Sequence, residues 1–172
     1  MDNERSCGSC TVCCKVPGID DKDLQKPVGL WCQYCDNKSA KPCTIYDTRP
    51  DTCKNFECLW LSDKQKALND DMRPDRSRMM LTSVIDDVGV MPAGSIMAWE
   101  VVPGAFDSPR NKKVIERLKN KVPILMMFLG GARKIVGSPE AMQEISRRVN
   151  QALAAQAQRT HVNDTDQGKQ TE

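Results

Sequence analysis

Residues 7–14 read Cys7-Gly8-Ser9-Cys10-Thr11-Val12-Cys13-Cys14, and this stretch decides how the N-terminal part of the chain folds. All nine cysteines of the 172-residue chain lie within its first 58 residues. In a C-x2-C step the backbone forms a tight turn, so that two sulfurs can face one ion at about 2.3 Å each. The dipeptide Gly8-Ser9 suits that turn because Gly tolerates positive φ. The stretch therefore predicts a metal-binding module.

The other cysteines extend this pattern with a further C-x2-C step and three single thiols. The candidate metal ligands are Cys7, Cys10, Cys13, Cys14, Cys32, Cys35, Cys43, Cys53 and Cys58. Nine thiols are one more than two tetrahedral sites require. Because adjacent side chains diverge, we expect Cys13 and Cys14 to serve different ions, or one of them to be a bridge or a spare thiol.

The ligand set is essentially all thiolate, because the only histidine, His161, lies in the polar C-terminal region. Thiolates suit zinc or iron–sulfur clusters and disfavour magnesium and calcium. Zinc bound by four cysteines has no open position for water, so such a module would be a scaffold. The C-x2-C-x2-C run also matches the first three ligands of a bacterial four-iron cluster motif, but the following x3-Cys-Pro is missing.

Dense cysteine is also typical of disulfide frameworks in short secreted chains. Here the residues before Cys7, Met-Asp-Asn-Glu-Arg-Ser, contain no apolar segment like that of a signal peptide. We therefore expect a cytoplasmic protein with reduced thiols that bind metal. Disulfides and buried or redox-sensing free thiols are the alternatives.

Together these residues resemble a known bacterial family, the zinc- or iron-chelating cysteine-cluster proteins of the YkgJ or CxxCxxCC type. The resemblance covers about the first 61 residues, and the segment 71–76 is similar to the family's continuation. It is carried by Cys7-x2-Cys10-x2-Cys13-Cys14, Trp31-Cys32-x2-Cys35, and Cys43-Thr-Ile45-Tyr46-Asp-Thr-Arg49-Pro50-x2-Cys53-x2-Phe56-x-Cys58-Leu-Trp60.

The resemblance implies chelation of zinc or iron by these cysteines, because the family is defined by its cluster and not by a reaction. A similar cluster occurs in proteins that methylate flagellin lysines. By analogy, this leaves open an iron–sulfur redox or protein-modification enzyme, or an accessory factor of one. An adaptor that binds a partner protein is a third hypothesis.

Aromatic residues lie among the cysteines and have a structural interpretation. We expect Trp31, Tyr46, Phe56 and Trp60 to cover the cluster with an apolar shell that limits solvent access. Pro50 pushes Arg49 toward an extended backbone, which would turn the chain so that Cys43 and Cys53 face one centre.

Charge and hydropathy argue against two other classes of protein. Residues 1–61 contain eight Lys or Arg against nine Asp or Glu, whereas a nucleic-acid surface needs clustered basic residues. No stretch has the roughly 18–20 apolar residues that a membrane span requires. The predicted partners are metal ions, with neither nucleic acid nor membrane.

The remainder of the chain predicts an α+β fold, with the cysteine module packed on a small antiparallel sheet and two helices. Strands are expected at 78–85, 95–102, 124–129 and 132–136. Ser108-Pro109 and Ser138-Pro139 begin the two helices; Pro123 stops the first, and the apolar face of the second continues to Leu153. The predicted units are residues 1–61, 62–157 and a disordered tail, 158–172.

Two further groups of residues have structural explanations. Met79, Met80, Met126 and Met127 could ligate a soft metal, but on apolar strands Met usually fills the core. The charged residues between Asp70 and Arg78 are expected to form a solvated, ion-paired loop. No catalytic residues are assigned, because the sequence lacks a phosphate loop, a nucleophile elbow and a histidine outside the tail.

Overall fold

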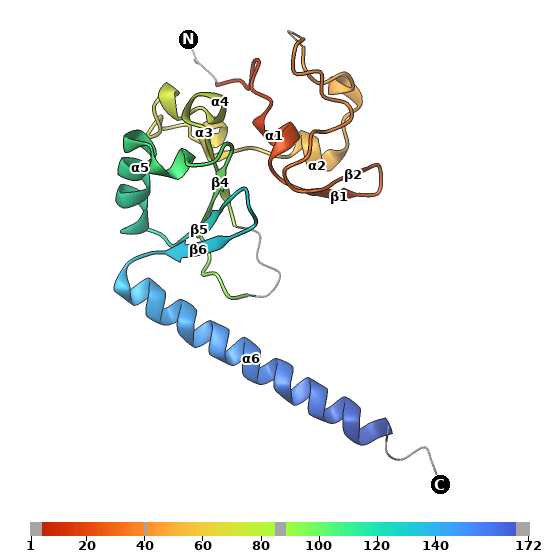
Figure 1. Cartoon of the computed structure of the whole chain (residues 1–172), viewed down its shortest axis with the longest axis vertical. Helices are drawn as coiled ribbons and strands as arrows, with labels where there is room; N and C mark the ends of the chain where they lie inside the picture. Colours follow the sequence, from red (N-terminus) through yellow and green to blue (C-terminus); the bar gives the residue numbers. More distant parts are fainter. Residues whose placement is uncertain (1–4, 40, 85–88, 168–172) are drawn as a thin grey trace.

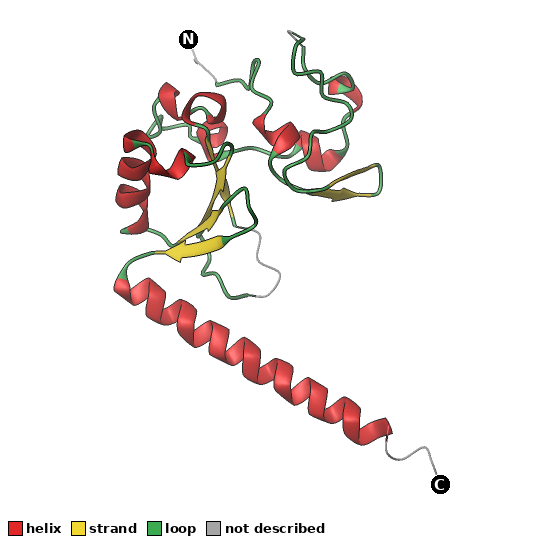
Figure 2. Cartoon of the chain, viewed as in Figure 1, coloured by secondary structure: helices red, strands yellow, loops and turns green. Residues whose placement is uncertain are grey.

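The computed structural model describes residues 5–39, 41–84 and 89–167, with side chains described as far as Gln156. The cysteine-rich residues fold into an N-terminal lobe beside a domain built on a sheet, and a long helix runs away from that domain (Figure 1). Figure 2 shows that loops dominate the N-terminal lobe, whereas helices and strands dominate the sheet domain.

The regular elements of the N-terminal lobe are all short. Strands β1 (Ile19–Asp21) and β2 (Leu24–Lys26) form an antiparallel hairpin. The helical segments are α1 (Val12–Lys15), the 3-10 turn η1 (Tyr46–Thr48), α2 (Asp51–Lys54) and α3 (Leu59–Ser62). Helices of one turn are not stable by themselves in water. The lobe therefore depends on packing against its neighbour and on whatever holds its cysteines together.

The sheet domain follows the predicted order of strand, strand, helix, strand, strand, helix. Its elements are η2 (Asp70–Met72), α4 (Pro74–Ser77), β3 (Met79–Ser83), β4 (Ile96–Glu100), η3 (Ala105–Asp107), α5 (Pro109–Lys119), β5 (Ile124–Met127), β6 (Arg133–Val136) and α6 (Pro139–Gln167). The α+β class is confirmed. Residue 85, the end of the first predicted strand, lies outside the described residues.

The four strands pair in the order β3-β4-β5-β6, and the sheet is mixed. The outer pairs, β3–β4 and β5–β6, are antiparallel as expected. The central pair is parallel, with Ile96 opposite Ile124, so the expectation of a wholly antiparallel sheet was wrong there. The reason is that α5 connects β4 to β5. It returns the chain to the edge of the sheet where β4 begins, so that β5 runs in the same direction as β4.

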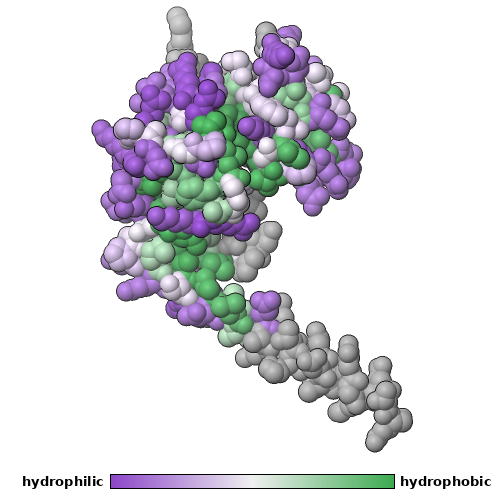
Figure 3. Space-filling view, viewed as in Figure 1, coloured by the Kyte–Doolittle hydropathy of each residue, from purple (hydrophilic) through white to green (hydrophobic). Residues whose placement is uncertain are grey.

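Both long helices begin at the predicted caps. The Ser108 Oγ accepts a hydrogen bond from the Asn111 N–H at 3.2 Å, and the Ser138 Oγ accepts one from the Ala141 N–H at 3.3 Å. Along α6, Ile145 is buried but Leu153 is 59% exposed. Among the described side chains of α6, the apolar face is thus covered at Ile145 and open at Leu153. Figure 3 shows apolar residues at the surface in the part of α6 nearer the sheet domain.

Helix α6 continues to Gln167, so residues 158–167, which belong to the predicted tail, have helical backbone. The expectation for residues 168–172 concerns positions outside the described residues. Within the described part of the chain, no helix has both the length and the apolar character needed to cross a membrane.

The core of the sheet domain lies between the sheet, α5 and the segment around α3. Its buried residues are Trp60, Leu68, Met72, Met79, Leu81, Ala98, Phe106, Ile115, Ile124 and Met126. Met79 and Met80 are each 1% exposed, and Met126 is also buried. The core interpretation of the strand methionines is confirmed for these three, while Met127 is only partly buried.

A second apolar cluster joins the N-terminal lobe to the sheet. Val12 and Val16 of the lobe pack with Met80 and Val101 of the sheet domain. Cys10, Cys13, Phe56, Cys58 and Trp99 pack against this cluster. Removing these side chains from water stabilises the junction by about 25 cal/mol per Å² of apolar surface. The cysteines of the lobe are therefore held against a rigid sheet.

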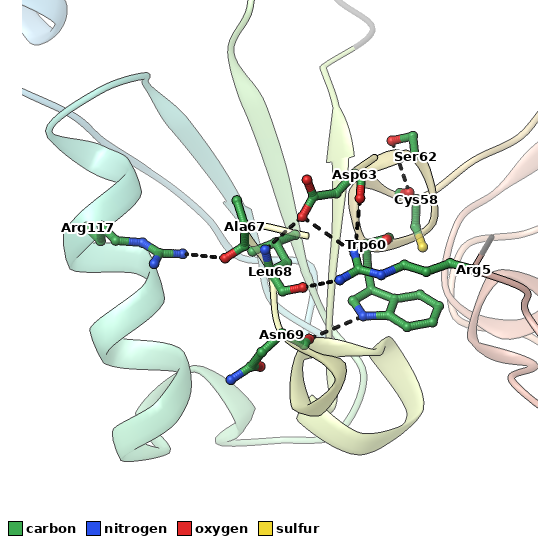
Figure 4. A network of polar contacts seen from close by, with 9 residues as sticks. All are labelled: Arg5, Cys58, Trp60, Ser62, Asp63, Ala67, Leu68, Asn69 and Arg117. Carbon is green, nitrogen blue, oxygen red and sulfur yellow. Dashed lines mark hydrogen bonds and ion pairs between the residues drawn. The ribbon is translucent and has the colours of Figure 1, made fainter. Parts of the chain in front are cut away.

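Arg5 makes a polar connection between the same two parts (Figure 4). Its guanidinium donates to the carbonyl oxygens of Trp60, at 2.6 Å, and of Leu68. It also lies 4.8 Å from the centre of the Trp60 ring and pairs with Asp63 at 3.4 Å. Arg5, two residues before Cys7, thereby ties the N-terminal lobe to residues beyond the predicted boundary at residue 61.

Candidate metal centre

Four separate segments, residues 7–14, 32–35, 43 and 53–58, bring the nine cysteines into one region. Cys7 and Cys10 lie in the turn before α1, where the Cys10 N–H donates to the Cys7 carbonyl at 2.9 Å. Cys13 and Cys14 lie on α1. The other thiols lie in the turn Cys32–Cys35, at Cys43, on α2 at Cys53, and at the N-cap of α3, Cys58.

Backbone hydrogen bonds hold these segments together. The Cys32 N–H donates to the Cys14 carbonyl at 2.8 Å, which brings the second C-x2-C turn to the end of α1. Cys35 and Cys43 face each other across an antiparallel bridge. The Thr52 hydroxyl donates to the Asp21 carboxylate at 2.5 Å, which ties α2 to the hairpin.

All nine thiols are free, and no disulfide joins any two of them. The structure therefore does not contain the disulfide framework that was one alternative prediction from the sequence.

The first group of thiols is Cys7, Cys10, Cys13 and Cys58. Burial raises the pKa of Cys7, and the nearby thiols of Cys13 and Cys58 raise it further. Burial also raises the pKa of Cys58 and raises that of Cys10 to about 11, with Cys13 adding to both shifts. The mutual influence of these four thiols means that a positive ion among them would relieve the repulsion of their charged forms.

The second group of thiols is Cys14, Cys32, Cys35, Cys43 and Cys53. Cys14 forms a side-chain hydrogen bond with Cys35. Burial raises the pKa of Cys35 and of Cys53, and in both cases Cys32 and Cys43 raise it further. Arg49 has the extended backbone expected before Pro50, and Cys43 and Cys53 do lie near each other.

Cys13 and Cys14 connect the two groups. The expectation that their side chains diverge was wrong, because the two thiols are hydrogen-bonded to each other. That bond lowers the pKa of Cys13 to about 7 and raises the pKa of Cys14. The lowered pKa favours the thiolate form of Cys13, which is the form that binds metals.

Cationic side chains surround the thiols. Arg49 opposes the rise in the pKa of Cys7 and Cys53 and contributes to the lowered pKa of Cys13, and its guanidinium stacks 3.7 Å from the centre of the Tyr46 ring. The Arg49 Nε donates to the Tyr46 carbonyl at 2.8 Å, which fixes its orientation. These contacts favour negative charge on the sulfurs of both groups.

Lys26 is a buried cation that the sequence interpretation missed. It is 5% exposed, and its ammonium donates to the carbonyl oxygens of Lys15, at 3.0 Å, and Leu30, at 3.1 Å, and to those of Pro17 and Pro27. The sequence did contain a signal for this burial. Side chains alternate between the two faces of a strand, so in β2 Lys26 lies on the same face as the buried Leu24.

The charge of Lys26 and the thiols affect each other. Burial lowers the pKa of Lys26, whereas the nearby Cys32, Cys14 and Cys13 raise it. A buried cation at this position offsets part of the repulsion between thiolates. Lys26 therefore acts both as a cross-link between loops and as a fixed positive charge beside the second group.

Replacing Lys26 with Met should lower the free energy of unfolding by about 2 kcal/mol, because buried carbonyl groups would lose a charged donor. Urea unfolding of the purified protein measures this change. The control is Lys22→Met in the exposed turn of the same hairpin, which should change stability by less than about 0.5 kcal/mol. Equal effects of the two substitutions would contradict the cross-linking role of Lys26.

The charged segment between Asp70 and Arg78 is ion-paired as expected, but part of it belongs to the cysteine site. Arg73 and Asp75 form a bidentate pair, with the Arg73 Nε 2.6 Å from the Asp75 Oδ1. The backbone N–H of Asp75 also donates to the sulfur of Cys10. The start of α4 therefore contacts the first group of thiols, and this pair is not merely solvated.

The predicted apolar shell is only partly present. Phe56 packs against the same cluster as Cys10, Cys13 and Cys58. Trp60 is instead buried in the core of the sheet domain, and Trp31 and Tyr46 are 44% and 59% exposed. The two exposed rings stack with cations, Lys15 and Arg49, which explains why they do not need to be buried.

The thiols lie in one region, but their side chains are not arranged as a complete set of metal ligands in the described residues. In residues 5–39, 41–84 and 89–167, no three His, Cys, Asp or Glu side chains already have the spacing that a metal ion requires. The chemistry of the donors nevertheless suits zinc or iron, since both groups consist of cysteine sulfurs. The side chain of His161 is outside the described part.

The chain was compared with family models, with curated proteins and with solved structures, and none of them matches it.

Proposed function

We propose that the N-terminal lobe binds zinc or iron through its cysteines and has a structural or metal-handling role. One observation carries this proposal: free thiols from four separate segments gather around Cys13 and Cys14, beside Arg49 and Lys26. Without metal, such a gathering of ionisable sulfurs is costly, because each thiolate raises the pKa of its neighbours. Bound cations would make the same arrangement favourable.

The two groups of thiols suggest how ions would be distributed. Cys7, Cys10, Cys13 and Cys58 would supply one set of four sulfurs. Cys14, Cys32, Cys35, Cys43 and Cys53 would supply a second set with one sulfur to spare. Tetrahedral zinc requires four ligands at each site. Thiols remain reduced in a cytoplasmic environment, and we place the protein there as part of the same proposal.

Elemental analysis of anaerobically purified protein tests this function. We expect zinc or iron in stoichiometric amounts, with more than one ion per chain if both groups are filled. Protein in which Cys7, Cys10 and Cys58 are all changed to serine should retain only the metal of the second group. Purified wild-type protein that holds neither zinc nor iron, and takes up neither under anaerobic conditions, would refute the proposal.

An iron–sulfur cluster is the second candidate, for a redox or protein-modification enzyme or an accessory factor of one. The observation that favours it is the first group itself. Its members are a C-x2-C-x2-C run and one distant cysteine, Cys58, and iron–sulfur clusters often have three closely spaced cysteines and a fourth elsewhere. Visible absorption and acid-labile sulfide in the anaerobic protein would favour iron–sulfur, whereas colourless protein with zinc would favour the scaffold.

A further inference from the structure

An open pocket of about 540 Å³ lies at the far end of α4 from the cysteines. Three arginines line it: Arg76 and Arg78 at the end of α4, and Arg110 in the first turn of α5. Between them, apolar side chains that include Val102 and Pro103 form a wall. The pocket therefore combines concentrated positive charge with an apolar surface.

Arg78, which lines this pocket, has an unfavourable backbone conformation. Its φ is +59°, in the left-handed region that residues other than glycine rarely adopt. Two hydrogen bonds maintain it: the Arg78 N–H donates to the Pro74 carbonyl, and the Arg78 carbonyl accepts from the Val101 N–H, each at 3.0 Å. Such strain is often found at functional sites. No partner of the Arg78 guanidinium is present within the described residues.

The other two arginines have exposed partners, and the Arg110 Nη1 donates to the Asp71 carbonyl at 3.3 Å. The Arg76 Nη1 is 3.5 Å from the Asp70 carbonyl. The Arg110 Nη2 is 3.8 Å from an Asp71 carboxylate oxygen, and these two side chains are 48% and 61% exposed. Exposed pairs of this kind contribute about 0–1 kcal/mol. Both guanidinium groups can therefore turn toward a ligand at little cost.

The walls behind the arginines are rigid. Asn111 is fully buried, and its Nδ2 donates to the carbonyls of Ser77 and Ala105, each at 2.8 Å. Both of those residues line the pocket. The buried Glu100 accepts a hydrogen bond from the Gly104 N–H at 2.8 Å, which holds the lining residue next to Ala105. A site whose supporting groups are fixed in this way loses little entropy when it binds a ligand.

We propose that this pocket binds a small phosphate monoester. Guanidinium groups match the geometry of phosphate oxygens with paired N–H donors, and three of them suit a dianion. The N-terminal end of α5, at the same edge of the pocket, favours the same charge. Val102 and Pro103 offer an apolar surface for the organic group, and the volume is within the usual range for small-molecule sites.

Titration with phenyl phosphate, followed by 31P NMR at constant ionic strength, tests this proposal on the full-length protein. Inorganic phosphate is the comparison, and it should bind more weakly because it lacks an apolar group. We expect Arg78→Asn to weaken phenyl phosphate binding at least tenfold, which corresponds to about 1.4 kcal/mol. Asn is chosen because it tolerates the left-handed backbone of this position.

A second pair of variants keeps the test independent of the folding of Arg78→Asn. Arg110→Gln removes a charge from the pocket, and Lys121→Gln removes one from the exposed turn beyond the opposite end of α5. Arg110→Gln should weaken binding severalfold, and Lys121→Gln should not change it. Equal weakening by the two variants would mean general charge attraction and would overturn the proposal. So would the absence of binding at millimolar phenyl phosphate.

Discussion

Removing the metal from anaerobically purified protein should unfold the N-terminal lobe while the sheet of residues 79–136 stays folded. In the described residues up to Ser62, the lobe has only short helices and one small hairpin, so little of its own regular structure could hold it without metal. Structural zinc sites in small domains contribute about 10–16 kcal/mol to folding. The chelated lobe would lose that contribution and would keep the repulsion between its thiolates.

Amide hydrogen exchange before and after chelation measures this effect. Protection should be lost between residues 7 and 58 and should persist in the central strands β4 and β5. Zinc added back under reducing conditions should restore the protection in the lobe. If the lobe stays fully protected after all metal has been removed, packing alone holds it, and a structural metal is excluded.

Cys13→Ser should cause the largest loss of metal among single cysteine substitutions. Cys13 influences the pKa of thiols in both groups, and its own pKa of about 7 makes it the most acidic of the shifted thiols. Loss of groups that merely support metal ligands typically costs 10- to 100-fold in affinity. Loss of this shared sulfur should therefore lower affinity by more than about 100-fold.

The comparison variant is Cys43→Ser, which removes a thiol from the second group only. Cys43→Ser should leave the metal of the first group in place, whereas Cys13→Ser should lower the content of both. Metal content per folded chain is measured by elemental analysis. A spectroscopic signal of Trp99, which lies in β4, checks that the sheet is folded. If Cys43→Ser lost as much metal as Cys13→Ser, Cys13 would not be the link between the groups.

The helices and strands could be predicted because their signals are local. Ser108-Pro109 and Ser138-Pro139 mark the beginnings of α5 and α6, since a cap acts within one turn of backbone. The parallel pairing of β4 with β5 could not be predicted from those signals. It depends on where α5 returns the chain, which is a property of the assembled sheet.

The site was predictable in composition but not in arrangement. The nine cysteines stand out in the sequence, and the C-x2-C spacing makes them candidate ligands. Lys26 and the Arg73–Asp75 pair did not stand out as part of the site. Lys26 acquires its role from the carbonyl groups of the loops on either side of it, and the Arg73–Asp75 pair from the contact of the Asp75 N–H with the distant Cys10 sulfur.

The amino-acid sequence by itself determined which residues are thiols, where the long helices begin, and that the fold mixes helices with strands. These features depend on residue chemistry and on interactions within a few positions of the chain. Only the tertiary structure decided that Cys58 belongs with the opening run, that Cys14 belongs with Cys35, and that three arginines share one pocket. Such groupings arise when packing against the sheet brings separate segments together, and spacing along a chain does not specify that packing.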